Sequence, residues 1–590
     1  MAESRKPQDD DPDVKSFDRE LFRKLLAFLK PYTRWVVLAL FLLFAAKLLG
    51  NATPRVMQQA IDGPIARGDF GGLWVPVLVF LLLKLGAFIS GFFQSILTTY
   101  IGQSIIRDLR MKLFSHILSL SMRFFGKNPV GRLMSRTVND TDVLNELFSS
   151  GLITVFGDIF TLLFIIGFML SLNIRLTLVS LSVLPLVAVV SWVFKGRLRS
   201  LFRQVRAKTA DMNSHLQESI TGMPVIHLFN QEKADAARFD THNRAYLRLY
   251  RDIVTSFSVF YPIMELLGTV ALALALWYGG VRYAGGGITI GVLVAFIQYV
   301  EDLFQPIRDL AEKYNILQNA MASSERIFKI LETHDSIPEP VRPARPAVSM
   351  GKVEFRNVSF AYTADKPVLQ DVSFTVEPGE TVALVGATGS GKTTVVNLLN
   401  RFYLPGSGAI DVDGIPLNDY ASEDLGRIIG SVSQEIFVFT DTVYQNISLG
   451  QTGVTRARVD RVARHINAAR FIENLPKGYD ALLNERGAGL STGQKQLLSF
   501  ARVLAHDPKI LILDEATSHI DPQTEGLIQE AIDKLTKNRT SIIVAHRLST
   551  IRHASKIVVL HHGRVAETGT HDELMRRGGL YERLYRIQFS

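Results

Sequence analysis

Six apolar runs recur in roughly the first 310 residues, and they constrain the fold of this chain more than any other feature. An α-helix rises 1.5 Å per residue, so about 20 residues cross the hydrocarbon core of a bilayer. Six such runs in series are difficult to bury inside a soluble protein, and six membrane-spanning helices are therefore predicted. The runs lie near residues 34–57, 73–97, 151–172, 176–196, 254–278 and 288–308.

The distribution of basic residues predicts the orientation of these helices. The stretches 101–150 and 195–251 are rich in Lys and Arg, whereas the connections on the other side carry only Arg67, Arg175 and Arg282. Basic loops stay in the cytoplasm, so we expect a multi-pass protein of the cell inner (cytoplasmic) membrane with both termini cytoplasmic. This topology explains the formal net charge of +9, and no nucleic-acid partner is needed. The lack of cysteine excludes disulfides, Cys-ligated zinc and thiol catalysis.

The charged stretches between the runs have helical apolar spacing, which predicts that the membrane helices extend into the cytoplasm. Ahead of the first run, FDRELFRKLLAFLKPY places apolar side chains on one face, as in a helix lying against membrane lipids. Four charged residues fall inside apolar runs. Such charges are costly in a membrane, and two interpretations stay open: they pair and fix helix packing, or they line a cavity and contact a small-molecule substrate. The four residues are Lys47, Lys84, Asp158 and Glu265.

The long apolar runs end before the proline-rich segment 337–350, whose composition predicts a semi-rigid linker. Short strands and helices alternate from there to the end. The predicted fold class is an α-helical six-span transmembrane domain followed by an α/β P-loop nucleotide-binding domain. The expected boundaries are an acidic N-terminal tail at 1–16, the transmembrane domain with its interfacial helix at 17–322, a linker at 323–350 and the nucleotide-binding domain at 351–590.

The motif GATGSGKTT at 386–394 follows an apolar strand and precedes a helix-like segment, which is the context that a P-loop requires. Its glycines permit turns that aim backbone N–H groups at phosphate, and the helix N-terminus favours an anion. Lys392 is expected to reach the β- and γ-phosphates of ATP, and Thr393 to ligate Mg²⁺. The residues expected to bind the nucleotide here are Gly386, Thr388, Gly389, Ser390, Gly391, Lys392, Thr393 and Thr394.

The second half of this predicted site is ILILDEATS, a buried strand that delivers two carboxylates at its end. Asp514 is expected to hold Mg²⁺, and Glu515 to orient and deprotonate the attacking water. Phosphoryl transfer depends on positioning and charge neutralisation more than on covalent help. His546 ends the strand TSIIVAH and can donate to the γ-phosphate, because ligands bind at strand ends in such folds.

The motif order GATGSGKTT, SVSQE, LSTGQKQ, ILILDEATSHID and IVAHRLST resembles that of ATP-binding cassette (ABC) transporters of the exporter type. The chain looks like one half-transporter, and the resemblance implies an ATPase coupled to transmembrane transport in a dimer. It also implies that Tyr362 stacks on adenine, and that Gln434 contacts Mg²⁺ and takes part in catalysis. The signature residues would face the ATP held by the partner subunit. These residues are Ser491, Gly493 and Gln494, while Asp521 and the NERG loop at 484–487 match further family elements.

One departure from the family pattern concerns the dimer partner. The signature reads LSTGQ, whereas most of the family has Gly at the position of Thr492. A β-branched side chain crowds the approach of a phosphate and restricts the backbone. We therefore expect a partner of a different sequence, with an intact LSGGQ-like signature and a degenerate Walker B glutamate. The alternative is that Thr is tolerated in an active homodimer.

The predicted function is ATP-driven export of amphipathic small molecules, drugs or lipids. Other readings are a homodimeric lipid flippase, an ATP-gated channel or regulatory subunit, and a soluble P-loop ATPase with a membrane anchor. Six spans exceed what an anchor needs, and the presence of Glu515 and His546 favours turnover over gating.

Overall fold

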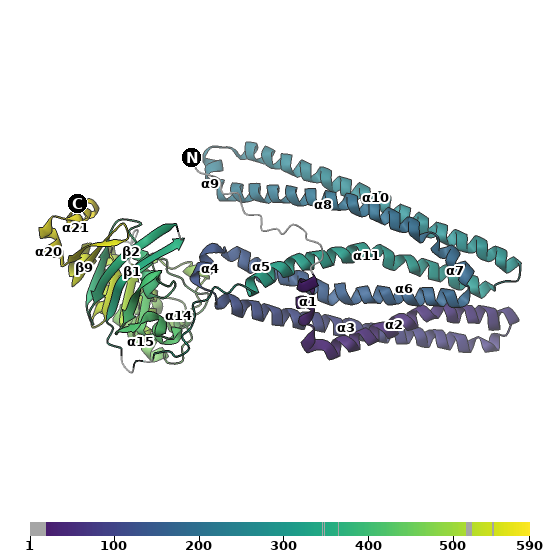
Figure 1. The fold of residues 1–590 in the computed structure, drawn as a ribbon, viewed down its shortest axis with the longest axis horizontal. Coiled ribbons are helices and arrows are strands. Elements are labelled where there is room, and N and C mark those ends of the chain that lie inside the picture. Colours follow the sequence, from purple (N-terminus) through teal and green to yellow (C-terminus); the bar gives the residue numbers. More distant parts are fainter. Residues whose placement is uncertain are drawn as a thin grey trace. The chain divides into compact units, whose positions relative to one another are not determined.

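The computed structural model describes residues 19–344, 346, 349–363, 365–514, 522–545 and 548–589. These residues form two compact units (Figure 1). The helical unit comprises the chain up to Leu118 together with Val130–Thr333. The α/β unit comprises Ser119–Pro129 together with the chain from His334 onward. The chain therefore passes between the units at three places, after residues 118, 129 and 333.

Long helices make up the helical unit. Its runs of Leu, Ile, Phe, Val and Ala suit the helix in an apolar environment, where every backbone group must be paired within the segment. The helices are α1 (Arg19–Ala27), α2 (Thr33–Ala60), α3 (Trp74–Leu118), α5 (Val130–Glu146), α6 (Leu152–Leu172), α7 (Ile174–Leu181), α8 (Leu184–Thr221), α9 (Met223–Leu228), α10 (Glu232–Ala284) and α11 (Ile290–Leu331).

Among the described residues, five stretches are long and apolar enough to cross a membrane. They contain the first five predicted runs, and all but the first two residues of the sixth run lie in α11. None of the residues in the most apolar 18-residue stretch of α3 is buried within the chain, so this part of the helix surface is available to lipid or to another subunit. At 45 and 53 residues, α3 and α10 are much longer than the roughly 20 residues needed for a crossing.

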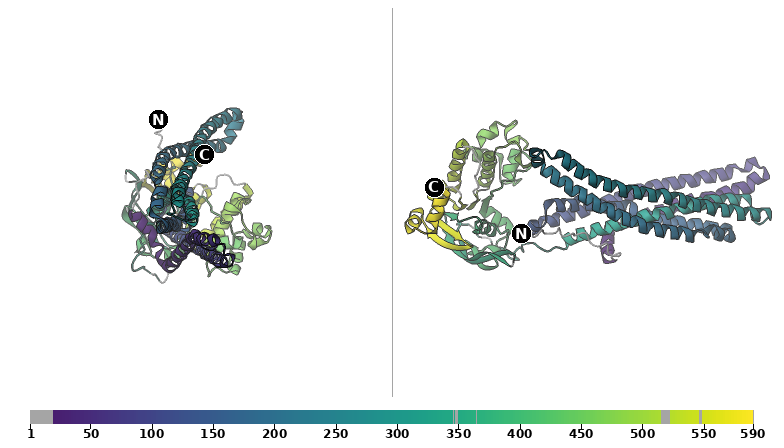
Figure 2. Two further views of the ribbon diagram at one scale, coloured as in Figure 1. Left: turned by 90° about the vertical axis from the view of Figure 1, so that its right-hand side faces the viewer. Right: turned by 90° about the horizontal axis from the view of Figure 1, so that it is seen from above.

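The core of the helical unit lies where α6, α7, α10 and α11 pack together. Met169, Met264, Phe296 and Tyr299 are buried there. The helices α8 and α10 run side by side and are joined by the short α9 (Figure 2). In α1, the first helix of the described residues, Leu25 is also buried.

The α/β unit contains two sheets. A four-stranded antiparallel sheet has the order β2–β1–β4–β5. A six-stranded sheet has the order β10–β9–β3–β8–β7–β6 and is parallel except for β10. The strands are β1 (Val353–Thr363), β2 (Lys366–Val376), β3 (Thr381–Val385), β4 (Ser407–Val412), β5 (Ile415–Pro416), β6 (Ile429–Val432), β7 (Ile510–Asp514), β8 (Thr540–Val544), β9 (Lys556–His561) and β10 (Arg564–Gly569).

Helices surround these sheets and bury the apolar strands, as expected for a parallel sheet with both faces covered. The short α4 belongs to this unit although it lies between α3 and α5 in the sequence. The helices are α4 (Met122–Lys127), α12 (Lys392–Leu399), α13 (Ser422–Ile428), α14 (Val443–Ser448), α15 (Arg456–His465), α16 (Ala469–Glu473), α17 (Thr492–His506), α18 (Pro522–Thr536), α19 (Leu548–His553), α20 (His571–Arg577) and α21 (Leu580–Phe589).

The predicted fold class is confirmed: a helical membrane domain precedes an α/β nucleotide-binding domain. One difference concerns the expected linker at 323–350, because α11 continues to Leu331. Ile327 and Ile330 are buried, so this part of the segment is held as helix by packing.

Candidate nucleotide site

The candidate site lies at the carboxyl edge of the six-stranded sheet. Val544 of β8 pairs with Leu384 of β3 on one side and with Asp514 of β7 on the other. Val432 of β6 pairs with Leu513 of β7. Because these four strands are parallel and in register, the segments that follow them emerge at the same edge. Ligands bind at this edge in open α/β sheets.

The P-loop connects β3 to α12. Gly389 and Gly391 have φ angles of 81° and 106°, a region that residues with a Cβ rarely adopt. A Cβ at Gly391 would lie 2.5 Å from Leu369 Cδ2, so glycine is also required by close packing. Gly391 is the N-cap of α12, and the loop therefore ends at a helix N-terminus that favours an anion.

Lys392 is the first residue of α12, and its ammonium group bends back over the loop. Its Nζ donates to the carbonyl oxygens of Gly386, at 2.7 Å, and Ala387, at 3.1 Å. Burial lowers the pKa of Lys392 from its usual range, and the nearby charge of Asp514 opposes this shift. A largely buried cation that bends over a phosphate loop is suited to bind the phosphates of ATP.

Two hydroxyl groups in the loop and helix also fit a phosphate and its metal ion. Ser390 Oγ is buried and has no hydrogen-bond partner among the described residues. Thr393 is exposed in the first turn of α12. Asp514 is partly buried at the end of β7. Hydroxyl and carboxylate oxygens are ligands that Mg²⁺ accepts, so the donor set fits a nucleotide with Mg²⁺.

Tyr362 lies at the end of β1 beside the helix that follows the P-loop. Its hydroxyl lies 3.3 Å from Thr394 Oγ1, and it accepts a hydrogen bond from Asn397 Nδ2 at 3.2 Å. The rings of Tyr362 and Tyr403 meet edge to face, with their centroids 5.1 Å apart. Asn397 and Tyr403 were not predicted as site residues. The sequence held one signal for Asn397: it lies four residues, about one helical turn, after Thr393.

Three residues of the predicted site, Glu515, Asp521 and His546, lie outside the described residues. Two of them directly follow described residues: Glu515 comes after Asp514 of β7, and His546 comes after Ala545, the residue beyond β8. Gln434 lies two residues beyond β6 and is exposed. The structure thus brings the P-loop, Asp514 and Gln434 to one edge of the sheet.

The signature motif forms the start of α17. Ser491 is the N-cap, and its hydroxyl accepts a hydrogen bond from the backbone N–H of Gln494 at 3.2 Å. The Gln494 side chain in turn accepts from the Ser491 N–H at 2.9 Å, which completes a capping box. Gly493 is buried, whereas Thr492 is exposed. Thr492 therefore presents its side chain outward at the first position of this helix.

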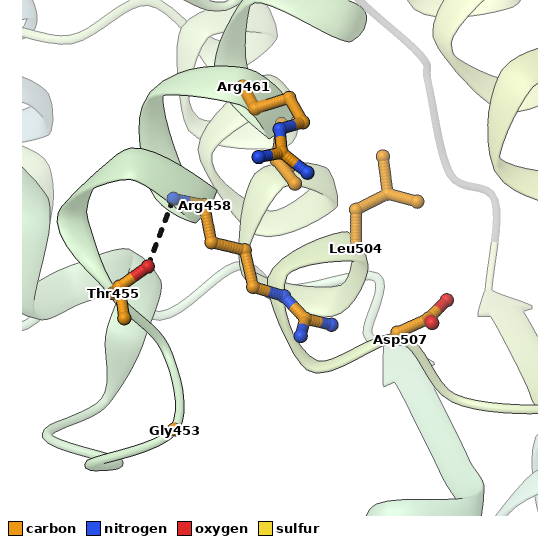
Figure 3. Close-up of a pocket in the computed structure, with 7 residues that line it drawn as sticks. Gly453, Thr455, Arg458, Arg461, Leu504 and Asp507 are labelled. Carbon is orange, nitrogen blue, oxygen red and sulfur yellow. Dashed lines mark hydrogen bonds between the residues drawn. The ribbon is translucent and has the colours of Figure 1, made fainter.

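A cavity of about 490 Å³ lies elsewhere in the α/β unit, between α15 and the far end of α17 (Figure 3). Arg458, Arg461 and Leu504 line it. From Ser491 to Leu504 the helix rises roughly 20 Å at 1.5 Å per residue, so this cavity is separate from the signature motif.

The site and the fold together define an ATPase domain attached to a multi-pass membrane domain. Residues 36–307 match the family model "ABC transporter transmembrane region", and residues 369–518 match the model "ABC transporter". The chain belongs to the ABC transporter family. It binds ATP and is an ATPase coupled to transport of the exporter type.

Similar proteins support this assignment over nearly the whole chain. An uncharacterized ABC transporter ATP-binding protein of Bacillus subtilis, YknV, is 37% identical over 581 residues, which cover 98% of this chain and 96% of the relative. The ATP-dependent lipid A-core flippase of Chromobacterium violaceum is 37% identical over 575 residues, 97% of each chain. A bacterial Atm1-family ABC exporter with ATP bound has a TM-score of 0.77 at 28% identity, covering 95% of this chain and 98% of that one.

Proposed function

We propose that this chain is one half of a heterodimeric exporter that uses ATP hydrolysis to move amphipathic small molecules, drugs or lipids across the bacterial inner membrane. Its termini are cytoplasmic in this proposal, because the basic stretches face the cytoplasm. The observation that carries the heterodimer is Thr492, which stands exposed at the first position of α17.

The start of α17 carries a capping box. The side chains of Ser491 and Gln494 each accept a hydrogen bond from the other residue's backbone N–H, which fixes the start of α17. The remaining N–H groups at this helix N-terminus can bind an anion. In this family that anion is the γ-phosphate held by the partner subunit. The branched side chain of Thr492 stands where most relatives have only a hydrogen. It keeps that phosphate further from the helix, and the partner's ATP is hydrolysed slowly or only held.

The chain's own nucleotide site is intact in this proposal. Lys392 contacts the β- and γ-phosphates, and Ser390 donates to a phosphate oxygen. Thr393, Asp514 and Gln434 hold Mg²⁺, which neutralises charge on the phosphates when bound. Glu515 orients the attacking water and accepts its proton, and His546 donates to the γ-phosphate. This site then needs a competent signature from the partner, which a second copy of this chain does not supply.

The substrate class is supported by the relatives and by the helical unit. A Bacillus subtilis protein named for multidrug export is 36% identical over 582 residues, and the lipid A-core flippase noted above is a similarly close relative. Both names point to amphipathic molecules. The exposed apolar surface of α3 and α10, with Phe88, Trp277 and Leu266, offers contact to such molecules or to lipid.

Purification of the chain alone and together with candidate half-transporters tests the heterodimer. We expect weak ATPase activity and weak ATP-dependent dye transport from the chain alone, and rescue by a second half-transporter with an LSGGQ-like signature. Brisk, drug-stimulated turnover by a clean homodimer would show that Thr492 is tolerated and would favour a homodimeric flippase. A nucleotide-dependent conductance without flux proportional to hydrolysis would instead identify an ATP-gated channel.

A further inference from the structure

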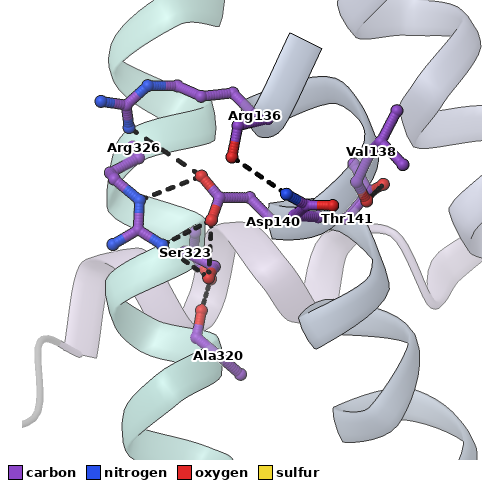
Figure 4. A network of polar contacts seen from close by, with 10 residues as sticks. Arg136, Val138, Asp140, Thr141, Ala320, Ser323 and Arg326 are labelled. Carbon is purple, nitrogen blue, oxygen red and sulfur yellow. Dashed lines mark hydrogen bonds and ion pairs between the residues drawn. The ribbon is translucent and has the colours of Figure 1, made fainter. Parts of the chain in front are cut away.

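The helical unit contains a network of polar side chains near the end from which the chain leaves for the α/β unit (Figure 4). Asp140 of α5 lies at its centre and is largely buried, with 11% of its side chain exposed. It accepts hydrogen bonds from Arg326 of α11 through Nε, at 2.9 Å, and Nη2, at 2.5 Å. Ser323 of α11 donates to the same carboxylate at 3.2 Å, and Arg136 lies 3.9 Å away.

The network continues from α5 to α3. Arg110 of α3 donates through Nε to the hydroxyl of Thr141, at 2.9 Å, and through Nη2 to the carboxylate of Asp142, at 2.5 Å. Thr141 directly follows Asp140 and is fully buried. We call this network the polar clamp. It consists of Arg110 on α3, Asp140, Thr141 and Asp142 on α5, and Ser323 and Arg326 on α11.

The three clamped helices are the three that lead into the α/β unit. The chain crosses into that unit after Leu118 at the end of α3, returns at Val130 at the start of α5, and crosses again after Thr333, just beyond α11. Arg110, Asp140 and Arg326 each lie about 10–15 Å along the chain from the nearest crossing, at 1.5 Å per residue. The clamp therefore joins these helices at one level.

The Asp140–Arg326 pair differs from a surface ion pair in its burial and its two-point geometry. A bidentate Arg–carboxylate pair fixes both the distance and the orientation of its partners. Removal of one member of a buried pair leaves an uncompensated charge, which is strongly unfavourable.

We propose that the polar clamp joins α3, α5 and α11 into one lever, with Asp140 as the positioning residue that links α5 to α11, so that movement of the nucleotide-binding unit reaches all three helices together. This inference rests on the ATP-driven cycle proposed above. Without the clamp, the α/β unit still binds and hydrolyses ATP, but its movement reaches the three helices separately and less of it drives transport.

Spin labels test the lever directly, because the chain has no cysteine and labels attach only where cysteines are introduced. Met111 of α3 and Lys329 of α11 are exposed and lie next to clamp residues. The doubly labelled full chain is placed in nanodiscs with its dimer partner and diluted with unlabelled chain. The distance between the labels is measured without nucleotide and with ATP and vanadate.

With Asp140 intact, we expect a narrow distance distribution whose mean does not change when ATP and vanadate are added. In Asp140→Asn the distribution broadens and its mean shifts with nucleotide. If Asp140→Asn fails to fold, Asp140→Asn/Arg326→Gln serves instead, because it removes both charges of the Asp140–Arg326 pair. Asp140→Glu, which keeps the charge, restores part of the rigidity. Asp240→Asn, which breaks an exposed pair with Arg244 on α10, is the matched control and behaves as the wild type.

A functional readout accompanies the distances. Hoechst 33342 transport per ATP hydrolysed, measured in inside-out vesicles, falls about 2- to 30-fold in the clamp variants, the range over which single residues modulate coupling between sites. If neither this dye nor a fluorescent phosphatidylethanolamine is carried by the wild type, the spin-label distances decide. Identical distributions in the wild type and the clamp variants overturn the lever. A wild-type chain that hydrolyses no ATP with any partner contradicts the proposed function instead, whatever the distances show.

Discussion

At the scale of single residues, the P-loop shows how local sequence determines a binding site. The positive φ angles of Gly389 and Gly391 disfavour any residue with a Cβ at both positions. These requirements are local, so the motif alone predicted the loop. The contacts of Lys392 with two loop carbonyls were not predictable, because they depend on how the side chain bends back over the loop.

Replacement of Lys392 by Ala should weaken ATP binding by about 10- to 100-fold, since a hydrogen bond to a charged group contributes about 1.5–3 kcal/mol. The apparent affinity for a fluorescent ATP analogue measures this change. Lys366→Ala, at an exposed position in β2, is the control and should bind as the wild type. An unchanged affinity in Lys392→Ala would mean that this ammonium does not contact the phosphates.

Glu515→Gln should retain ATP binding but lower steady-state hydrolysis about 100-fold or more, as expected for the loss of a general base. The glutamine has nearly the same shape but cannot accept a proton from water. Hydrolysis must be measured with the partner's site silenced, so that only this chain's site contributes. Near-normal turnover under that condition would remove Glu515 from the catalytic role.

At the scale of helices, the apolar runs predicted where the membrane helices lie, because length and composition alone decide whether a segment can cross. The partners of the charged residues inside them were not predictable. Asp158 of α6 forms an ion pair with Lys313 of α11, which is 155 residues away in the sequence. Lys47 packs its side chain near Gly157, and Lys84 lies 5.8 Å from the ring centroid of Phe80. Among the described residues, no ion pair joins any two of these four charged residues.

The Asp158–Lys313 pair should hold α6 against α11, because both side chains are largely buried. Asp158→Ala and Lys313→Met should each lower the unfolding temperature in nanodiscs, and the double variant should lose less than their sum. We expect a coupling energy of about 0.6–1.7 kcal/mol, as double-mutant cycles give for polar pairs in membrane proteins. The exposed Lys208–Asp211 pair of α8 is the control and should show no measurable coupling. Strict additivity of the two single effects would mean that the pair does not join the helices.

At the scale of the whole molecule, the sequence motifs predicted the class of protein, and the strand register explains how the motifs meet. P-loop, Asp514 and Gln434 are separated by long stretches of chain, yet the parallel order β3–β8–β7–β6 brings them to one edge. The order of strands in a sheet depends on crossovers that no local pattern specifies. The inclusion of α4 in the α/β unit was likewise not predicted, because nothing in its six residues distinguishes it from a turn between membrane helices.

The dimer itself is tested by Thr492→Gly in the chain purified alone. In a homodimer, each intact set of Walker motifs faces the LSTGQ signature of the other copy, and hydrolysis should be slow at both sites. Glycine removes the branched side chain and lets the start of α17 approach the phosphate, so the ATPase rate should rise about 10-fold or more, given that one well-placed backbone donor is worth about 10²–10³ in rate. Thr492→Ser keeps the hydroxyl without the methyl group and should give an intermediate rate, and Thr492→Gly/Glu515→Gln should abolish the gain. Equal rates for Thr492 and glycine at this position would contradict the steric argument and, with it, the need for a different partner chain.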